Sequence, residues 1–187
     1  MNIRDLEKID SKKMYQTYDK WPEIAKDGFD NDFEKFDAKG IDHIVFSGMG
    51  GSGSIGDVIS AILSKEDIHV SNVKGYHLPK TVDSNTLVIS TSVSGNTKET
   101  LTVLEKAQKT DAKIAVFSSG GMIQKFSKTN NLFFQEISMI HSPRASFPKF
   151  LFSILNILRE IIPIKKTDVE EAISSLEITR NTIFSNR

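Results

Sequence analysis

Five short apolar runs, separated by amphipathic segments, occupy the middle of the chain. The runs are rich in β-branched and aliphatic residues, as buried strands are, and they cover residues 41–47, 69–73, 86–91, 112–118 and 131–137. Between them, apolar residues recur at helical spacing, as at Leu101 and Leu104 within residues 97–109. Such a pattern is typical of a parallel sheet covered on both faces. It predicts an α/β fold, a three-layer α-β-α sandwich with a five-stranded parallel sheet.

A different pattern precedes the strands. Residues 2 to about 37 are rich in charge and mostly helical in spacing, and Pro22 is expected to break the helical run just after Trp21. We interpret residues 1–39 as an N-terminal helical arm laid over a domain of residues 40–187. The anchors of the arm are interpreted as packing residues, and they are Met14, Tyr15, Tyr18, Trp21 and Ile24.

The last third of the chain predicts two helices. One opens at Ser142-Pro143-Arg144, and its apolar residues between 147 and 162 cover nearly the whole circumference. A helix that is apolar on all sides must be buried on all sides, and a five-stranded sheet covers only part of it. We therefore expect a second copy of the chain, in a homodimer, or a missing second domain to cover the rest. The other helix, residues 168–184, is amphipathic.

Composition narrows the classes of partner and chemistry. The 24 basic and 24 acidic residues cancel, which removes the global field that favours nucleic acid or membrane binding. The absence of cysteine excludes a thiolate metal site and a cysteine nucleophile, and we predict neither a metal nor a cofactor. Residues 1–8 are too polar for a secretory signal, and charged residues interrupt the apolar stretch 147–164. We predict a soluble, cytoplasmic protein.

The segment Ser92–Thr97 lies between a predicted strand and a predicted helix, and it carries hydroxyls, an amide and a glycine but no charge. The first N–H groups of a helix lack internal partners and the helix dipole adds positive charge there, so this turn suits a phosphate group. Ser92, Ser94 and Thr97 can each donate a hydrogen bond to an anionic oxygen, and Gly95 lets the backbone approach it. The alternative is that one of these polar side chains merely caps the helix.

A second glycine turn, Gly48–Gly53, follows the first predicted strand and matches the spacing G-x-G-x-x-G of dinucleotide-binding loops. That motif requires an acidic residue at the end of the second strand to bind ribose, where this chain has Lys74-Gly75. No Gly-Lys-Ser/Thr follows, so the loop is not a P-loop either. We interpret it as bare backbone brought close to a ligand, with glycines that serve only a tight turn as the alternative.

Taken together, these features resemble a known family. The chain is similar to the sugar isomerase (SIS) domain in four segments: GMGGSGSIGD at 48–57, SVSGNTKET at 92–100, SPRA at 142–145, and YDKWPE at 18–23 in the arm. More narrowly, it resembles the first half of the two-domain bifunctional phosphoglucose/phosphomannose isomerases. The resemblance implies a flavodoxin-like sandwich around five parallel strands. It also implies that the second SIS domain of that family is absent from this chain.

The resemblance implies a site as well. The residues implied to contact the substrate are Gly50, Gly51 and Ser52 for the sugar and Ser92, Ser94 and Thr97 for its phosphate. Arg144 would lie by the carbonyl end of the sugar and stabilise an enediolate, and a preorganised cation at a developing oxyanion is a large catalytic term. A surface salt bridge is the alternative for Arg144, and it is unattractive because an arginine opposes the dipole at a helix N-terminus.

The implied activity is aldose–ketose isomerisation of glucose 6-phosphate, and of mannose 6-phosphate, to fructose 6-phosphate by proton transfer through an enediolate. The general base of the family, a glutamate, and its ring-opening histidine lie in the second half, beyond residue 187. Proton transfer needs a base, and the candidates within this chain are Glu99, Glu136 and His141, of which His141 is the best substitute. We interpret the chain as the phosphate- and sugar-binding half of such an enzyme, without its general base.

Two other functions compete with this interpretation. A sugar-phosphate-sensing SIS module without catalysis, as in regulators, ranks second. A helix-turn-helix arm for binding DNA would support it, but the arm here has mixed charge and no such pattern. A nucleotide-binding domain ranks third, because the acidic ribose ligand is missing.

Overall fold

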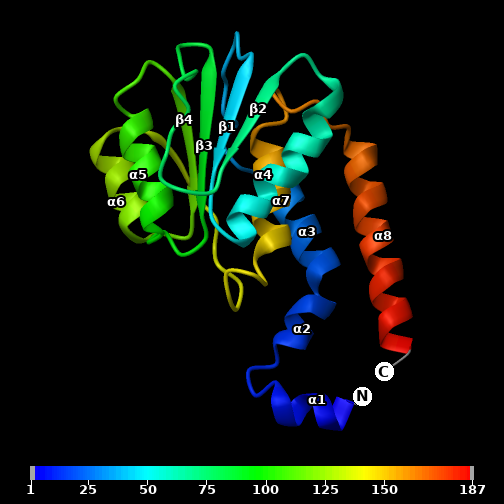
Figure 1. Cartoon of the computed structure of the whole chain (residues 1–187). Helices are drawn as coiled ribbons and strands as arrows, with labels where there is room; N and C mark the ends of the chain where they lie inside the picture. The colour runs from blue at the N-terminus through cyan, green and yellow to red at the C-terminus, as the bar shows by residue number, and fades with distance from the viewer. Residues whose placement is uncertain (1–2, 186–187) are drawn as a thin grey trace.

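The computed structural model of the chain describes residues 3–185 and is built around one parallel sheet (Figure 1). The strand order is β2-β1-β3-β4-β5, and every neighbouring pair is parallel. The strands are β1 His43–Ser47, β2 His69–Val73, β3 Thr86–Ser92, β4 Lys113–Ser118 and β5 Phe133–Glu136. The five-stranded parallel sheet predicted from the apolar runs is confirmed.

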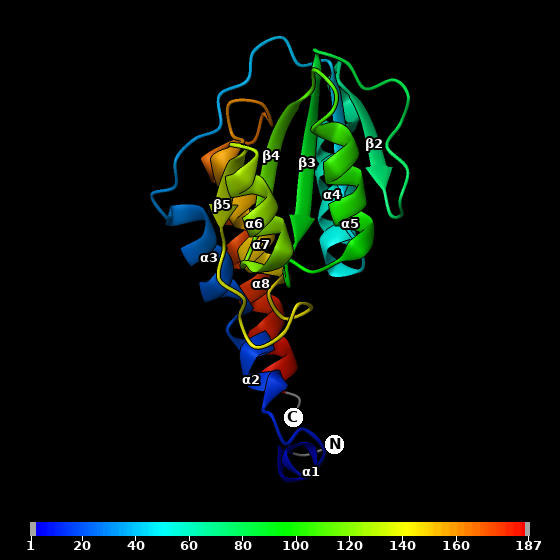
Figure 2. The same ribbon diagram turned by 90° about the vertical axis from the view of Figure 1, so that its left-hand side faces the viewer.

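Helices cover both faces of this sheet, as Figure 1 and Figure 2 show. One face carries α5 Lys98–Ala107 and α6 Gly121–Thr129, and the other carries α4 Gly51–Ile62, α7 Phe147–Ile157 and α3 Trp21–Asp30. The remaining helices are α1 Ile3–Ile9, α2 Met14–Asp19, the short 3₁₀ turn η1 Leu63–Lys65, and α8 Lys166–Ser185. The predicted three-layer α-β-α sandwich is therefore also confirmed.

Alternation along the strands builds two cores. Neighbouring residues of a strand point to opposite faces. Accordingly, Ile44 and Phe46 of β1 join the apolar cluster that includes α4 and α7, whereas Val45 joins the cluster that includes α5 and α6. All residues of β1 and of β3 are buried, which explains why these two central strands have nearly continuous apolar sequences.

The helix α3 belongs to the body of the protein. Pro22 was expected to break a helical run, but it lies in the first turn of α3, where the missing N–H of a proline removes no helical hydrogen bond. Ala25 is fully buried, and a side chain at Gly28 would lie 2.9 Å from the carbonyl oxygen of Lys149 in α7. The Asn156 amide of α7 also donates to the carbonyl of Asn31 at 2.9 Å. The arm thus packs closely against α7.

The burial of α7 corrects a prediction. The helix begins at Phe147, after a turn over residues 143–146, and all of its residues from Pro148 to Ile157 are buried within this one chain. The sheet, α3 and α4 pack around it, and Val169 of α8 joins the same apolar cluster. The expectation that a second copy or another domain must cover α7 is wrong, because α3 supplies the surface that the sheet could not.

The far end of α8 is more exposed than the rest of the fold. Only Val169 of this helix is buried, and Ile178 and Ile183 are 65% and 51% exposed. In Figure 1, α1, α2 and the end of α8 extend beyond the edge of the sheet at which the strands end. Within residues 3–185, no helix is both long enough and apolar enough to cross a membrane.

Candidate functional site

The two glycine turns meet at one edge of the sheet. The strand β1 pairs with both β2 and β3, so the order of the strands reverses there and the loops after β1 and β3 diverge from neighbouring positions. The first loop, residues 48–52, touches the second, Ser92–Thr97, where the Val93 N–H donates to the Ser52 hydroxyl at 3.4 Å. The prediction that both turns lie at one edge is confirmed.

Hydrogen bonds inside the second loop, which we call the serine loop (Ser92–Thr97), fix its shape. Ser92 is almost completely buried, and its hydroxyl accepts the N–H of Gly95 at 3.1 Å. The hydroxyls of Ser92 and Thr97 bond each other at 2.9 Å, which closes the loop across its base. Ser94 is exposed at the tip. Of the three hydroxyls predicted to hold phosphate, Ser94 is therefore the most accessible.

The structure also addresses the capping alternative. Thr97 is the N-cap residue of α5, but its hydroxyl bonds Ser92 and makes no capping hydrogen bond to the helix. The Asn96 side chain does cap a helix, but it is α6, where its oxygen accepts the N–H of Met122 at 3.1 Å. Plain capping of α5 therefore does not account for these side chains. The positive end of the α5 dipole faces the serine loop.

A third loop, Ser118–Gly121 at the end of β4, packs against the serine loop. Gly95 has φ of +70°, and a side chain there would lie 1.8 Å from the carbonyl oxygen of Gly120. The Ser119 N–H donates to the carbonyl of Val93 at 3.2 Å. Sequence reasoning did not include this loop in the site, although two serines followed by a glycine pair, directly after a strand, were a usable signal.

The glycines of the first loop and of the first turns of α4 divide between the two interpretations, a tight turn and a backbone open to a ligand. Gly56 is needed for packing, because a side chain there would lie 2.8 Å from Cβ of Phe46 on β1. Gly53 is equally confined by the carbonyl oxygen of Gly48 at 2.7 Å. Gly50 and Gly51 are exposed, and an added side chain at either would meet no atom within 4 Å. Their backbone is thus open to a ligand at the start of α4.

A cation follows β2 at the same edge. Lys74 forms an ion pair with Asp57 of α4 at 2.6 Å, and its aliphatic stem lies over Gly53. The Asn72 amide donates to the same carboxylate at 3.3 Å. These contacts hold α4 against β2, and they place a lysine where a dinucleotide-binding fold needs a carboxylate. Lys74 is a second feature that sequence reasoning did not assign to the site.

Arg144 lies on the turn of residues 143–146, not in the first turn of α7. Figure 1 shows this segment, drawn in yellow, at the edge where the strands end. The side chain of Arg144 is exposed, and within residues 3–185 it has no ion pair or hydrogen bond, with the two glycine turns or with any other group. The salt-bridge alternative for Arg144 thus finds no partner in the described part of the chain.

The three candidate bases all lie beside other groups. The Glu99 carboxylate interacts with the Tyr76 hydroxyl and raises the pKa of that phenol. The Glu136 carboxylate accepts the amide of Gln124 at 3.0 Å. His141 is exposed, and its Nε2 lies 3.0 Å from the carbonyl oxygen of Lys12 in the arm. Within residues 3–185, no three His, Asp or Glu side chains gather as a metal site would require.

Known proteins resemble this chain in sequence. The model of the SIS domain matches residues 39–136, just over half of the chain. A bifunctional phosphoglucose/phosphomannose isomerase of Thermoplasma acidophilum is 35% identical over 149 residues, which cover 77% of this chain and 44% of that protein. The protein of the same name in Aquifex aeolicus is 36% identical over 157 residues, covering 81% and 48%. The chain thus spans somewhat less than half the length of these relatives.

Solved structures show the same fold. A putative phosphosugar isomerase of Clostridium difficile 630 superimposes with a TM-score of 0.62 at 21% identity, covering 90% of this chain and 51% of that one. The parallel sheet, the glycine turns at one edge and the match to the family model agree with the motifs seen in the sequence. The chain belongs to the SIS domain family.

Proposed function

We propose that this chain is the phosphate- and sugar-binding half of an aldose–ketose isomerase that interconverts glucose 6-phosphate, and mannose 6-phosphate, with fructose 6-phosphate. The names of the relatives support the reaction class. The observation that carries the proposal is the contact between the hydroxyl-lined serine loop and the open backbone of Gly50 and Gly51, through Val93 and Ser52. One loop suits an anion and the other suits an uncharged polyol beside it.

The proposed phosphate site uses the three hydroxyls differently. Ser94, at the exposed tip, donates to a phosphate oxygen, with Thr97 and the first N–H groups of α5 beside it. Ser92 acts mainly through its bonds to Gly95 and Thr97, which hold the loop in shape. The phosphate is bound without a lysine or arginine, by dipoles and hydroxyls alone.

The proposed sugar site continues from there toward the first glycine loop. The N–H groups of Gly50 and Gly51 and the hydroxyl of Ser52 contact the sugar hydroxyls. When a base removes the proton from C2 of the open-chain aldose, negative charge develops on the carbonyl oxygen, and Arg144 stabilises it. The base then delivers the proton to C1, and the hydroxyl proton on O2 moves to O1, which yields the ketose. The base is supplied by the second half of the enzyme, because Glu99 interacts with Tyr76, and Glu136 and His141 bond other groups.

We propose that the second SIS domain is the partner of this chain, joined through the exposed end of α8. The chain spans 44% of one relative and 48% of another, which leaves room for that domain. The apolar side chains of Ile178 and Ile183, rather than α7, supply the surface that supports a partner. Because the substrates are central hexose phosphates, we also propose a cytoplasmic location and a place in glycolysis and gluconeogenesis. The assembled enzyme is proposed to be a homodimer.

The experiment is an isomerase assay coupled to a dehydrogenase. We expect the 187-residue chain to show little or no turnover with fructose 6-phosphate, and the same chain fused to a second SIS domain of a relative to be active. In the fusion, Arg144→Ala should lower kcat far more than it raises KM, as expected for transition-state stabilisation. Arg159→Ala is the control, because Arg159 is exposed and pairs only with its neighbour Glu160 among the described residues.

Two results would change the proposal. Strong turnover by the 187-residue chain alone, abolished by His141→Ala, would place the base within this half. Binding of hexose 6-phosphate without turnover in the fused protein would favour the sugar-phosphate-sensing module, the second candidate function.

A further inference from the structure

We propose that Trp21 is a positioning residue for Arg144, so that the N-terminal arm sets the place of the arginine at the site. The role given to Arg144 rests on the proposed function, but the contact between the arm and the turn does not. We call residues 138–146, which connect β5 to α7, the arginine loop.

The indole of Trp21 contacts the arginine loop directly. Its Nε1–H donates a hydrogen bond to the carbonyl oxygen of Ala145 at 3.0 Å, across 124 positions of sequence. Ala145 is fully buried and is bonded covalently to Arg144. The Arg144 side chain has no partner of its own among the described residues, so the backbone beside it fixes the point from which this side chain extends.

The rest of the arginine loop is braced from within. The Ser146 hydroxyl is fully buried, accepts the N–H of Ile140 at 2.8 Å and lies 2.8 Å from the carbonyl oxygen of Ser142. The loop therefore forms a compact turn. Two hydrogen bonds among the described residues attach it to the arm, one from Trp21 and one between His141 and the carbonyl of Lys12 at 3.0 Å.

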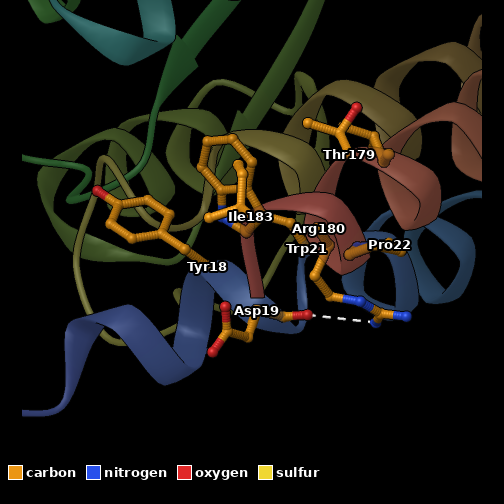
Figure 3. Close-up of a pocket in the computed structure, with 8 residues that line it drawn as sticks. Tyr18, Asp19, Trp21, Pro22, Thr179, Arg180 and Ile183 are labelled. Carbon is orange, nitrogen blue, oxygen red and sulfur yellow. Dashed lines mark hydrogen bonds between the residues drawn. The ribbon is translucent and has the colours of Figure 1, made fainter. Parts of the chain in front are cut away.

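The indole of Trp21 packs against Tyr18 on one side and borders a cavity on another. The Tyr18 ring packs edge-on against it, with the ring centroids 5.0 Å apart. Trp21 also lines a largely apolar cavity of about 300 Å³ between the arm and α8, shown in Figure 3. The indole is therefore not enclosed by close packing on every side. Its hydrogen bond to Ala145 is a directional contact that joins it to the arginine loop.

The arm is itself tied to α8 beside the cavity. Arg180 of α8 donates to the carbonyl oxygen of Asp19 at 3.3 Å, the dashed line in Figure 3, and pairs with the Glu23 carboxylate. Trp21 lies between these two arm residues in sequence. The backbone of Trp21 is thus held against α8 through Asp19 and Glu23, and its indole N–H in turn holds the backbone at Ala145, next to Arg144.

The first test removes the indole N–H. In Trp21→Phe a smaller aromatic ring remains and the buried carbonyl of Ala145 loses its donor, so hydrogen exchange in residues 138–146 of the full chain should become roughly fivefold faster, the factor that one neutral hydrogen bond supplies. Tyr18→Phe is the control, because it keeps the edge-on ring contact and the indole N–H. Unchanged exchange in Trp21→Phe, or equal changes in both variants, would overturn the positioning role.

The second test uses a spectroscopic signal, since Trp21 is the only tryptophan of the chain. Binding of fructose 6-phosphate should shift the Trp21 emission with the same half-saturation that calorimetry gives. Arg144→Ala should abolish the shift while heat of binding is retained through the serine loop. Inorganic phosphate alone should leave the emission unchanged.

The outcomes separate this inference from the proposed function. Calorimetric binding with constant Trp21 emission would overturn the coupling between Trp21 and Arg144. An emission shift that survives in Arg144→Ala would overturn it as well. Absence of any binding heat would contradict the proposed function, and the exchange comparison would then still decide whether Trp21 holds the arginine loop.

Discussion

Gly95 and Gly50 both have positive φ, +70° and +54°, yet they should respond differently to the same substitution. In Gly95→Ala the new side chain would lie 1.8 Å from the carbonyl oxygen of Gly120, so the serine loop or the third loop must move. We expect a loss of at least about 2 kcal/mol in the free energy of unfolding. Gly50→Ala meets open space and should lose less than Gly95→Ala, because only the backbone strain of an alanine at φ +54° and ψ −127° remains, about 1–3 kcal/mol.

Urea unfolding of the two variants beside the wild type measures this difference. The comparison is matched, since both glycines lie in loops at the same edge and both become alanine. Equal losses for Gly95→Ala and Gly50→Ala would mean that φ strain alone matters and that the serine loop does not press on the third loop.

The lowered pKa of His43 should make the free energy of unfolding depend on pH. Its ring is buried at the start of β1, with Nε2 3.1 Å from the Ser71 hydroxyl and Nδ1 3.3 Å from that of Thr86. Burial, and then the charge of nearby His69, lowers the pKa of His43. An unfolded histidine titrates near about 6.5, so the unfolded chain binds the proton more tightly. The stabilisation is full above that pH and is lost as pH falls through the lower folded value.

We therefore expect a lower urea midpoint at pH 5.5 than at pH 7.5, two values chosen about one unit either side of the unfolded pKa. His43→Gln removes the titrating ring, so its own difference between the two pH values should be smaller. An undiminished difference in His43→Gln would assign the pH dependence to other groups.

The arm and α7 form the element pair on which the fold depends. A chain that begins at residue 40 lacks α3, and thereby exposes the face of α7 that contacts Ala25 and Gly28. Buried groups such as Asn156 would also lose their partners on residues 29–31. We expect this shortened chain to aggregate or to lose cooperative thermal unfolding. Several apolar side chains of α7 become exposed to water, and each loses about 1.5–3 kcal/mol of burial energy.

A chain that begins at residue 14 is the control for that deletion. It lacks α1 and the Lys12 carbonyl that His141 bonds, but it keeps α3 and should unfold cooperatively. If the chain from residue 40 folded as well as the chain from residue 14, the arm would be an appendage and residues 40–187 an independent domain.

At the scale of elements, the sequence predicted the sheet well and the packing of α7 poorly. The strands are visible because burial on both faces leaves continuous apolar runs, and β2 agrees with its predicted bounds, residues 69–73. The periodicity of α7 shows that the helix is apolar on all sides, but not what covers it. The cover, α3, lies more than a hundred positions earlier, and Pro22 was interpreted as a break although it lies in the first turn of that helix.

The candidate site divides in the same way. Both glycine turns were predictable, because each follows a buried strand and parallel strands end at the same edge. The contact of Gly95 with Gly120 and the bond between Ser92 and Thr97 depend on how separate loops come together. The contact of Trp21 with Ala145 joins residues 124 positions apart and has no local signal in the sequence.

At the scale of the whole molecule, the structure unites three separate parts of the sequence at the edge where the strands end. The loops after β1 and β3 supply hydroxyls and open backbone, and the arginine loop is held there by the arm. None of these parts forms a site alone. The central claim is that the serine loop binds the phosphate of a hexose 6-phosphate.

Titration calorimetry of fructose 6-phosphate into the 187-residue chain tests that claim most directly. We expect saturable binding to the wild type, and a loss of about 1.5–3 kcal/mol, roughly ten- to hundredfold in affinity, in Ser94→Ala with the fold intact. Ser64→Ala, an exposed serine just after α4, should bind as the wild type does. Equal affinities for wild type and Ser94→Ala, or no binding to either, would contradict the account.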